Sequence, residues 1–136
     1  MVIAKWLVAV VDDELDIASL FREYLSGIKD VLVLSFTDPV LALEHFINNK
    51  SEYFLIISDL KMPKLSGIEL IKKVKEANPF VRTLLMTAFE VSDPMFEEYR
   101  QTNIIDDFVQ KPVRLEDLHS IVKKHLTLYK KFKKEF

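Results

Sequence analysis

The stretch LIISDLKMPKLSG, residues 55–67, decides how the rest of the chain is interpreted. It opens with consecutive branched apolar residues, which are typical of a strand buried on both faces of a parallel sheet. Asp59 then stands at the carboxyl end of the predicted strand, where open α/β sheets bind their ligands. A carboxylate there costs desolvation free energy unless a cation or hydrogen-bond donors meet it. Asp59 alone would be interpreted as a turn cap, so residues from other segments must decide its role.

Composition indicates one globular domain. The chain has 136 residues, of which 49% are apolar and 29% charged, so we expect a single domain over 1–136 with its core at about 4–128. The net charge of −2 gives no field that would draw the protein to nucleic acid or to a membrane surface. The absence of cysteine excludes disulfides, thiolate zinc sites and thiol catalysis.

The N-terminal residues do not resemble a signal peptide. The short apolar run at 6–11 meets Asp12 and Asp13 at once and lacks a signal-peptide cleavage site. No apolar run approaches the roughly 20 residues of a spanning helix. We therefore expect a soluble, cytoplasmic protein that binds neither membranes nor nucleic acid directly. Residues 129–136 form a basic extension, interpreted as a solvated face, with an extended helix or a linker to a further domain as alternatives.

Short apolar runs alternate with amphipathic stretches along the chain. The predicted strands are 5–11, 30–36, 53–58, 81–89 and 104–109. Helices are predicted at 14–28, after Asp38-Pro39, from Ser66 with Glu69 in a capping box, after Ser92, and from 115 onward. This alternation predicts an α/β fold in which helices cover both faces of a five-stranded parallel sheet. Two acids in the last strand favour an edge position, but periodicity does not give the strand order.

Polar residues of particular types stand where these strands end. Asp12 and Asp13 follow the first strand, Asp59 the third, Thr87 closes the fourth and Lys111 follows the fifth. In a parallel sheet all of them meet at one edge. Clustered carboxylates stay ionised together only when a cation is bound, and oxygen ligands suit Mg²⁺. A lysine and a hydroxyl beside them suit a phosphoryl group.

Each of these residues also has a purely structural interpretation. An acid pair after a strand often caps a helix, Thr87 is a good β-former, and Lys111 could be a solvated surface lysine. Taken alone, each residue is explained by the structural interpretation at least as well as by the functional one. Their coincidence at one edge of the sheet favours a functional site.

Four segments together resemble the receiver domain of two-component response regulators: VVDDE at 10–14, SDLKMPKLSG at 58–67, MTA at 86–88 and FVQKP at 108–112. They keep the family's order and spacing over nearly the whole chain. The resemblance implies a doubly wound, flavodoxin-like sheet in the order 2-1-3-4-5. It also implies a switch that accepts a phosphoryl group, with Mg²⁺, from a sensor histidine kinase or a phosphotransfer protein.

The resemblance assigns a role to each residue of the predicted site. Asp59 would be the phosphoacceptor and form an aspartyl phosphate. Asp13, Asp59 and the backbone carbonyl of Lys61 would bind Mg²⁺ directly, and Asp12 would act through a bound water molecule. Lys111 would pair with a phosphoryl oxygen.

Further residues would carry the signal away from the site. Thr87 would donate its hydroxyl to the phosphate, and Phe108 would change position when Thr87 moves. Phe89 would flank the phosphoryl group, and the Lys111-Pro112 bond is cis in family members. The surface formed by the fourth helix, fifth strand and fifth helix would then bind an unknown downstream protein or output domain, or form a phosphorylation-dependent homodimer.

Two other classes of protein share parts of this pattern. A magnesium-dependent hydrolase with an aspartyl nucleophile often has a general acid two residues after it, where this chain has Lys61. A degenerate receiver binds partners without phosphorylation, but here the acids, Thr87 and Lys111 are all present. The leading hypothesis is therefore a signalling switch that turns over only its own phosphoryl group and is not an enzyme for external substrates.

Overall fold

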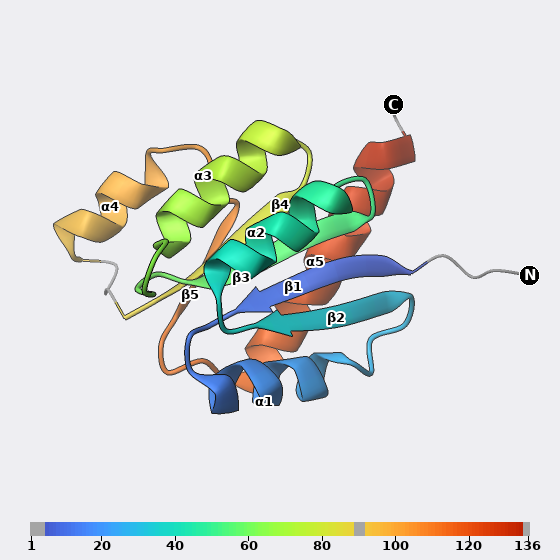
Figure 1. Cartoon of the computed structure of the whole chain (residues 1–136), viewed down its shortest axis with the longest axis horizontal. Coiled ribbons are helices and arrows are strands. Elements are labelled where there is room, and N and C mark those ends of the chain that lie inside the picture. Colours follow the sequence, from blue (N-terminus) through green and yellow to red (C-terminus); the bar gives the residue numbers. More distant parts are fainter. Residues whose placement is uncertain (1–4, 89–91, 135–136) are drawn as a thin grey trace, which may run out of the picture.

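The computed structural model describes residues 5–88 and 92–134, in which strands and helices alternate (Figure 1). The strands are β1 Trp6–Val11, β2 Val31–Phe36, β3 Tyr53–Asp59, β4 Arg82–Thr87 and β5 Asp107–Gln110. The helices are α1 Leu15–Leu25, α2 Pro39–Asn48, α3 Gly67–Ala77, α4 Pro94–Arg100 and α5 Leu115–Lys134. The predicted α/β alternation is confirmed.

The strands form one parallel sheet in the order β2-β1-β3-β4-β5. This confirms the doubly wound fold and the strand order that the resemblance implied. β5 lies at an edge, as its acids indicated, and β3 lies at the centre with every residue buried. The central position of β3 places Asp59, its last residue, between the ends of β1 and β4.

Helices cover both faces of the sheet (Figure 1). One core cluster joins the strands to α1 and α5 through residues such as Phe21 and Leu118, and the other joins them to α2 and α3 through Phe46 and Leu70. α4 differs from these four helices because none of its residues is buried. It is attached through half-buried side chains such as Tyr99, which packs against a small cluster near β5.

Local signals in the sequence explain where two helices begin. Ser66 caps α3: its side chain accepts from the backbone N–H of Glu69, whose side chain accepts in turn from the backbone N–H of Ser66. This is the predicted capping box. Asp38 caps α2 through the backbone N–H of Val40, with proline at the start of the helix. Both predicted helix starts are confirmed.

The predicted boundary of the fifth strand is wrong at its start. The strand begins at Asp107 and not at residue 104, because the segment before it bonds to side chains. The carboxylate of Asp106 accepts from the backbone N–H of Thr83, and the hydroxyl of Thr83 donates to the carbonyl of Ile104. These bonds hold 104–106 outside the regular ladder.

The first helix is shorter than predicted, whereas the last helix agrees with its predicted start. α1 ends at Leu25 and not at residue 28, and of the apolar residues at helical spacing Leu20 and Tyr24 remain 45% and 39% exposed. α5, predicted from residue 115 onward, continues to Lys134, and Tyr129 is buried in the core. Phe89 lies outside the described residues.

Among the helices within residues 5–88 and 92–134, none is both long enough and apolar enough to cross a membrane.

Candidate functional site

The strand ends bring the predicted polar residues together at the carboxyl edge of the sheet. Asp59 ends β3, and Asp12 and Asp13 follow β1, which is paired with β3. One carboxylate oxygen from each of the three acids lies within 4.8 Å of the others. Thr87 ends β4, and its carbonyl accepts from the backbone N–H of Lys111 at 2.8 Å. All five residues therefore lie at the same edge of the sheet, as expected for parallel strands.

Lys111 neutralises the acid at the centre of the site. Its Nζ lies 2.7 Å from Oδ1 of Asp59. Burial works against the charge of Lys111, but its hydrogen bond with Asp59 and the attraction of Asp59 and Asp12 more than offset this, so the pKa of Lys111 is raised. The lysine is therefore a persistent cation beside Asp59. The Lys111-Pro112 peptide bond is cis, as the resemblance implied.

Only one of the two carboxylate oxygens of Asp12 has a hydrogen-bond partner among the described residues. Its side chain is almost fully buried, and Oδ1 accepts from the backbone N–H of Glu14 at 2.9 Å. Oδ2 is buried and has no hydrogen-bond partner among the residues that the structure describes. Burial, and then repulsion by Asp59, raise the pKa of Asp12 against the effect of the Glu14 N–H. A structural cap at this position would explain Oδ1 but not Oδ2.

The donor set fits a hard divalent cation. Three carboxylates converge, one of them with an orphaned buried oxygen, and only oxygen donors are offered. Mg²⁺ prefers such oxygen ligands and keeps part of its hydration shell. Asp13 is exposed, so water and a metal ion can reach the cluster from solvent. Lys61 follows β3 after one residue, and its side chain is exposed. The role of its carbonyl as a ligand stays a prediction.

Gly67 has a role at this site that sequence reasoning missed. A Cβ atom on Gly67 would overlap the carbonyl oxygen of Asp59 and approach a methyl group of Leu85 at 3.0 Å. The N–H of Gly67 donates to the carbonyl of Leu60 at 2.8 Å, which folds the β3–α3 loop back onto the strand end. The signal was available, because glycine occurs only twice in the chain and Gly67 directly follows the helix-capping Ser66.

Phe108 lies where movement at the sheet edge can reach α4. Its side chain is half-buried in a cluster with Leu85 and Tyr99. Its ring centroid lies 4.7 Å from that of Phe96 on α4, with the ring planes tilted by 45°. Thr87, on the neighbouring strand, is buried. Phe108 therefore connects the strand beside Thr87 with a helix that buries none of its own residues.

Comparison with known proteins shows which protein family this chain matches. The family model described as the response regulator receiver domain matches residues 8–123. The chain is 30% identical over 128 residues to the luminescence regulatory protein LuxO of Vibrio campbellii, covering 93% of this chain and 27% of that protein. It is 28% identical to sporulation initiation phosphotransferase F of Bacillus subtilis, covering 89% of this chain and 94% of that protein. The chain thus spans about a quarter of LuxO but nearly all of the sporulation protein.

A solved structure supports the fold independently. A response regulator receiver domain protein from Clostridium thermocellum superposes with a TM-score of 0.80 at 23% identity, covering 93% of this chain and 98% of that one. At this identity the likeness establishes the fold alone.

Proposed function

Because the chain belongs to the response regulator receiver domain family, it is a phosphorylation-activated switch, and we propose that Asp59 accepts the phosphoryl group. One observation carries this assignment. Asp59 ends the central strand with its carboxylate 2.7 Å from the ammonium group of Lys111 and in reach of the oxygens of Asp12 and Asp13. The carboxylate is thus held at a fixed point among the charges that a phosphoryl group requires.

The transfer forms one covalent bond to the protein and breaks one bond in the donor. A carboxylate oxygen of Asp59 attacks the phosphorus of a phosphohistidine, and an O–P bond forms as the P–N bond breaks. The electron pair of the P–N bond stays on the imidazole nitrogen, which takes up a proton. Lys111 leaves Asp59 and pairs with a phosphoryl oxygen, so its charge stays where negative charge accumulates.

Receiver domains bind Mg²⁺ at an acidic pocket, and the donor set described above fits that ion. Asp13, Asp59 and the backbone carbonyl of Lys61 would hold it, with Asp12 acting through a bound water molecule. When bound, Mg²⁺ neutralises charge on the phosphoryl oxygens. The orphaned Oδ2 of Asp12 supports this assignment, because it would gain the hydrogen-bond partner that it lacks.

The signal leaves the site through Thr87. A phosphoryl group on Asp59 offers the hydroxyl of Thr87 a charged acceptor, which is worth about 1.5–3 kcal/mol. Movement of Thr87 toward it opens space that Phe108 fills. Since Phe108 contacts Phe96, its movement displaces α4. This displacement costs little packing free energy, because α4 buries none of its residues. The α4-β5-α5 face is then the surface that a downstream protein, an output domain or a second copy of the chain reads.

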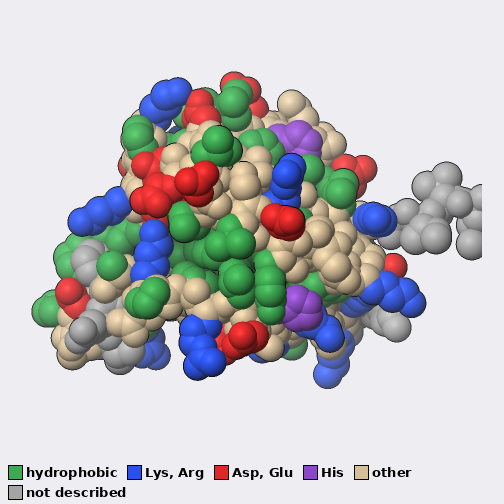
Figure 2. All heavy atoms as spheres, turned by 90° about the horizontal axis from the view of Figure 1, so that it is seen from below, with side chains coloured by type: hydrophobic (Ala, Val, Ile, Leu, Met, Phe, Trp, Pro, Cys, Tyr) green, Lys and Arg blue, Asp and Glu red, His purple; other side chains and the backbone are tan. Residues whose placement is uncertain are grey.

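The phosphodonor is a sensor histidine kinase or a phosphotransfer protein, which must approach Asp59 closely. An apolar patch over α1 supports a protein donor: Figure 2 shows hydrophobic side chains gathered on this face. Leu15, Leu20 and Tyr24 are 66%, 45% and 39% exposed, and Leu15 lies two residues after Asp13. Exposed apolar groups this close to a charged site favour docking of a protein surface. We propose that the chain acts in the cytoplasm as one domain over 1–136, which is consistent with a donor of this kind.

Acetyl phosphate separates the three candidate classes of protein. With Mg²⁺, the switch gains one phosphoryl group on Asp59, whereas a degenerate receiver gains none. A hydrolase releases inorganic phosphate continuously without accumulating the adduct. Intact-protein mass spectra and a phosphate-release assay, each with Mg²⁺ and with chelator, distinguish these results. Autodephosphorylation of a switch also releases some phosphate, so the adduct decides between the two classes. Continuous release with no adduct on Asp59 in the presence of Mg²⁺ would overturn the assignment as a switch.

A further inference from the structure

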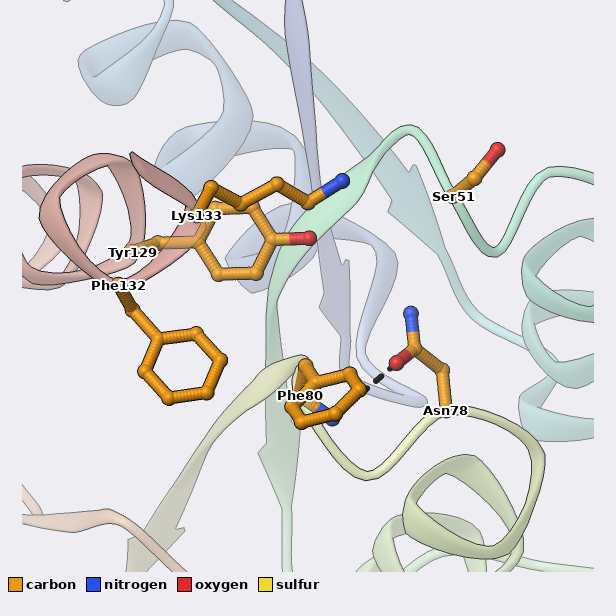
Figure 3. A pocket seen from close by; sticks show the side chains of 6 residues that line it. All are labelled: Ser51, Asn78, Phe80, Tyr129, Phe132 and Lys133. Atoms are coloured by element: carbon orange, nitrogen blue, oxygen red, sulfur yellow. Dashed lines mark hydrogen bonds between the residues drawn. The ribbon is translucent and has the colours of Figure 1, made fainter. Parts of the chain in front are cut away.

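A second site of interest lies at the opposite end of the sheet from Asp59. A hollow of about 350 Å³ lies beside the amino ends of β3 and β4. Figure 3 shows the side chains that line it. Along β3 it lies roughly 20 Å from the carboxyl edge, since each strand residue advances the chain by about 3.3 Å. Segments distant in sequence form its lining, which consists of Ser51, Asn78, Phe80, Tyr129, Phe132 and Lys133. None of these residues takes part in the phosphorylation chemistry.

The hydroxyl of Tyr129 is the most unusual group in the hollow. The side chain is 1% exposed, and its hydroxyl has no hydrogen-bond partner among the described residues. Figure 3 shows the phenol reaching from α5 into the hollow. The ring is held by Trp6 and Phe54, at centroid distances of 5.3 and 6.4 Å, so it cannot readily turn to find a partner elsewhere. Buried hydroxyls are normally hydrogen-bonded, so this one lacks the acceptor that such a donor usually has.

Lys133 adds a positive charge beside that donor. Its Nζ lies 5.4 Å from the ring centroid of Trp6 and 5.7 Å from that of Tyr129, so the ammonium group rests over two aromatic rings. In Figure 3 the Lys133 ammonium and the Tyr129 hydroxyl extend to the same side of α5. Burial raises the pKa of Tyr129, so the hydroxyl keeps its proton at neutral pH. The two groups together suit an anionic oxygen.

Phe80 and Phe132 supply the apolar wall. Their ring centroids are 5.3 Å apart with the planes tilted by 40°, and the side chains are 51% and 37% exposed. Two adjacent aromatic rings that remain exposed offer a surface on which a further ring can stack. A ligand with one flat ring and one acidic group would cover these rings and reach the polar groups at the same time.

We propose that this hollow binds a small aromatic carboxylate. The ring lies against Phe80 and Phe132, and the carboxylate accepts from the hydroxyl of Tyr129 and the ammonium group of Lys133. A cationic aromatic is disfavoured by Lys133, the one charged side chain among the described residues of the lining. Larger polyanions such as nucleotides are disfavoured because they require more than one cation.

Benzoate is the probe that tests this proposal, with benzamide as its uncharged match and cyclohexanecarboxylate as its non-aromatic match. Titration is followed by the amide signals of Ser51 and Phe80 and by the indole N–H of Trp6, the only tryptophan in the chain. Benzoate should give saturable shifts at all three reporters, with a Kd near the millimolar range, and should bind more tightly than either match. No saturation up to about 10 mM would overturn the proposal.

Three variants separate the specific site from general charge attraction. Tyr129→Phe removes only the hydroxyl and should weaken benzoate binding by about 2–10-fold. Lys133→Gln should weaken it by a similar factor and remove the preference over benzamide. Lys131→Gln is the matched control, because Lys131 is exposed on the same helix outside the lining, and it should leave the Kd unchanged. Unchanged affinity in Tyr129→Phe, or equal losses in the two lysine variants, would contradict the proposed site.

Discussion

Two groups of acids at opposite ends of the strands differ in whether cations and hydrogen-bond donors of the protein satisfy their carboxylate oxygens. At the carboxyl edge, Asp12, Asp13 and Asp59 converge, and an oxygen of Asp12 is left without a partner among the described residues. At the start of β5, Asp106 pairs with Lys75 at 2.8 Å, and Asp107 accepts from Lys124 at 2.8 Å and from His125 at 3.1 Å. The first group is incomplete in the protein alone, and the second is complete.

The titration behaviour of the two groups has opposite signs. Burial and the nearby carboxylate of Asp59 raise the pKa of Asp12. The hydrogen bond from His125 outweighs burial and, with Lys124, lowers the pKa of Asp107. His125 is itself held by the Nε–H of Arg82, which donates to its Nδ1 at 3.2 Å. The acids at the start of β5 are thus neutralised by neighbouring side chains. The acids of the proposed site leave one buried carboxylate oxygen without a partner among the described residues.

Removing an acid from the incomplete group should cost activity and not stability. Asp13→Ala should reduce the rate of phosphorylation by acetyl phosphate by about 100-fold or more, because the metal ion loses a direct ligand. The apo variant should be slightly more stable than the parent, since repulsion among the carboxylates is relieved. Labelling rates and urea unfolding without Mg²⁺ measure the two effects. Normal labelling of the variant in chelator would mean that the acid pair only caps α1.

Removing the hydroxyl that we propose binds the phosphoryl group should separate labelling from switching. Thr87→Ala should still accept phosphate on Asp59 but lose a bias of about 1.5–3 kcal/mol toward the active state. Amide hydrogen exchange over residues 92–118, with and without beryllofluoride, follows the shape change. Wild type should change protection there and Thr87→Ala should not. Equal changes in both would mean that the signal leaves the site by another route.

Removing an acid from the complete group should have the reverse effect. Asp107→Asn should lower the free energy of unfolding by about 2 kcal/mol, because charge-assisted hydrogen bonds from His125 and Lys124 are lost. Phosphorylation of the folded variant should be unchanged. Urea unfolding and acetyl phosphate labelling test both statements. Asp117→Asn is the matched control, because this acid is exposed and its nearest cation, Arg114, is 4.0 Å away.

Low pH should reduce the difference in unfolding free energy between the Asp107→Asn variant and its parent. The pKa of folded Asp107 lies below its unfolded value of about 3.9, so its contribution to stability is fully present above that pH and is lost as pH falls further. Unfolding free energies of the two proteins at pH 7 should therefore differ more than those measured below about pH 4. A gap that stays constant down to pH 3 would show that the charge of Asp107 contributes nothing.

The sequence predicts whatever depends on local pattern or on strand direction. Ser66 and Glu69 lie within one helical turn, so their capping box is readable, and parallel strands oblige Asp12, Asp59 and Thr87 to share an edge. Partners that come from distant segments are not readable in this way. Arg82 and His125 are 43 positions apart, and their contact depends on how α5 crosses the sheet. The late start of β5 has the same cause, because partly buried hydrogen bonds of the Thr83 and Asp106 side chains interrupt the regular ladder before Asp107.

The fate of Asp59 tests the account most directly. Wild type and Asp59→Asn are incubated with acetyl phosphate and Mg²⁺, and intact mass and peptide mapping are recorded for both. The account predicts one phosphoryl group per wild-type chain, located on the peptide that contains Asp59 and absent in chelator. It predicts no adduct on Asp59→Asn. A full-stoichiometry adduct on that variant would contradict the assignment of Asp59 as the phosphoacceptor.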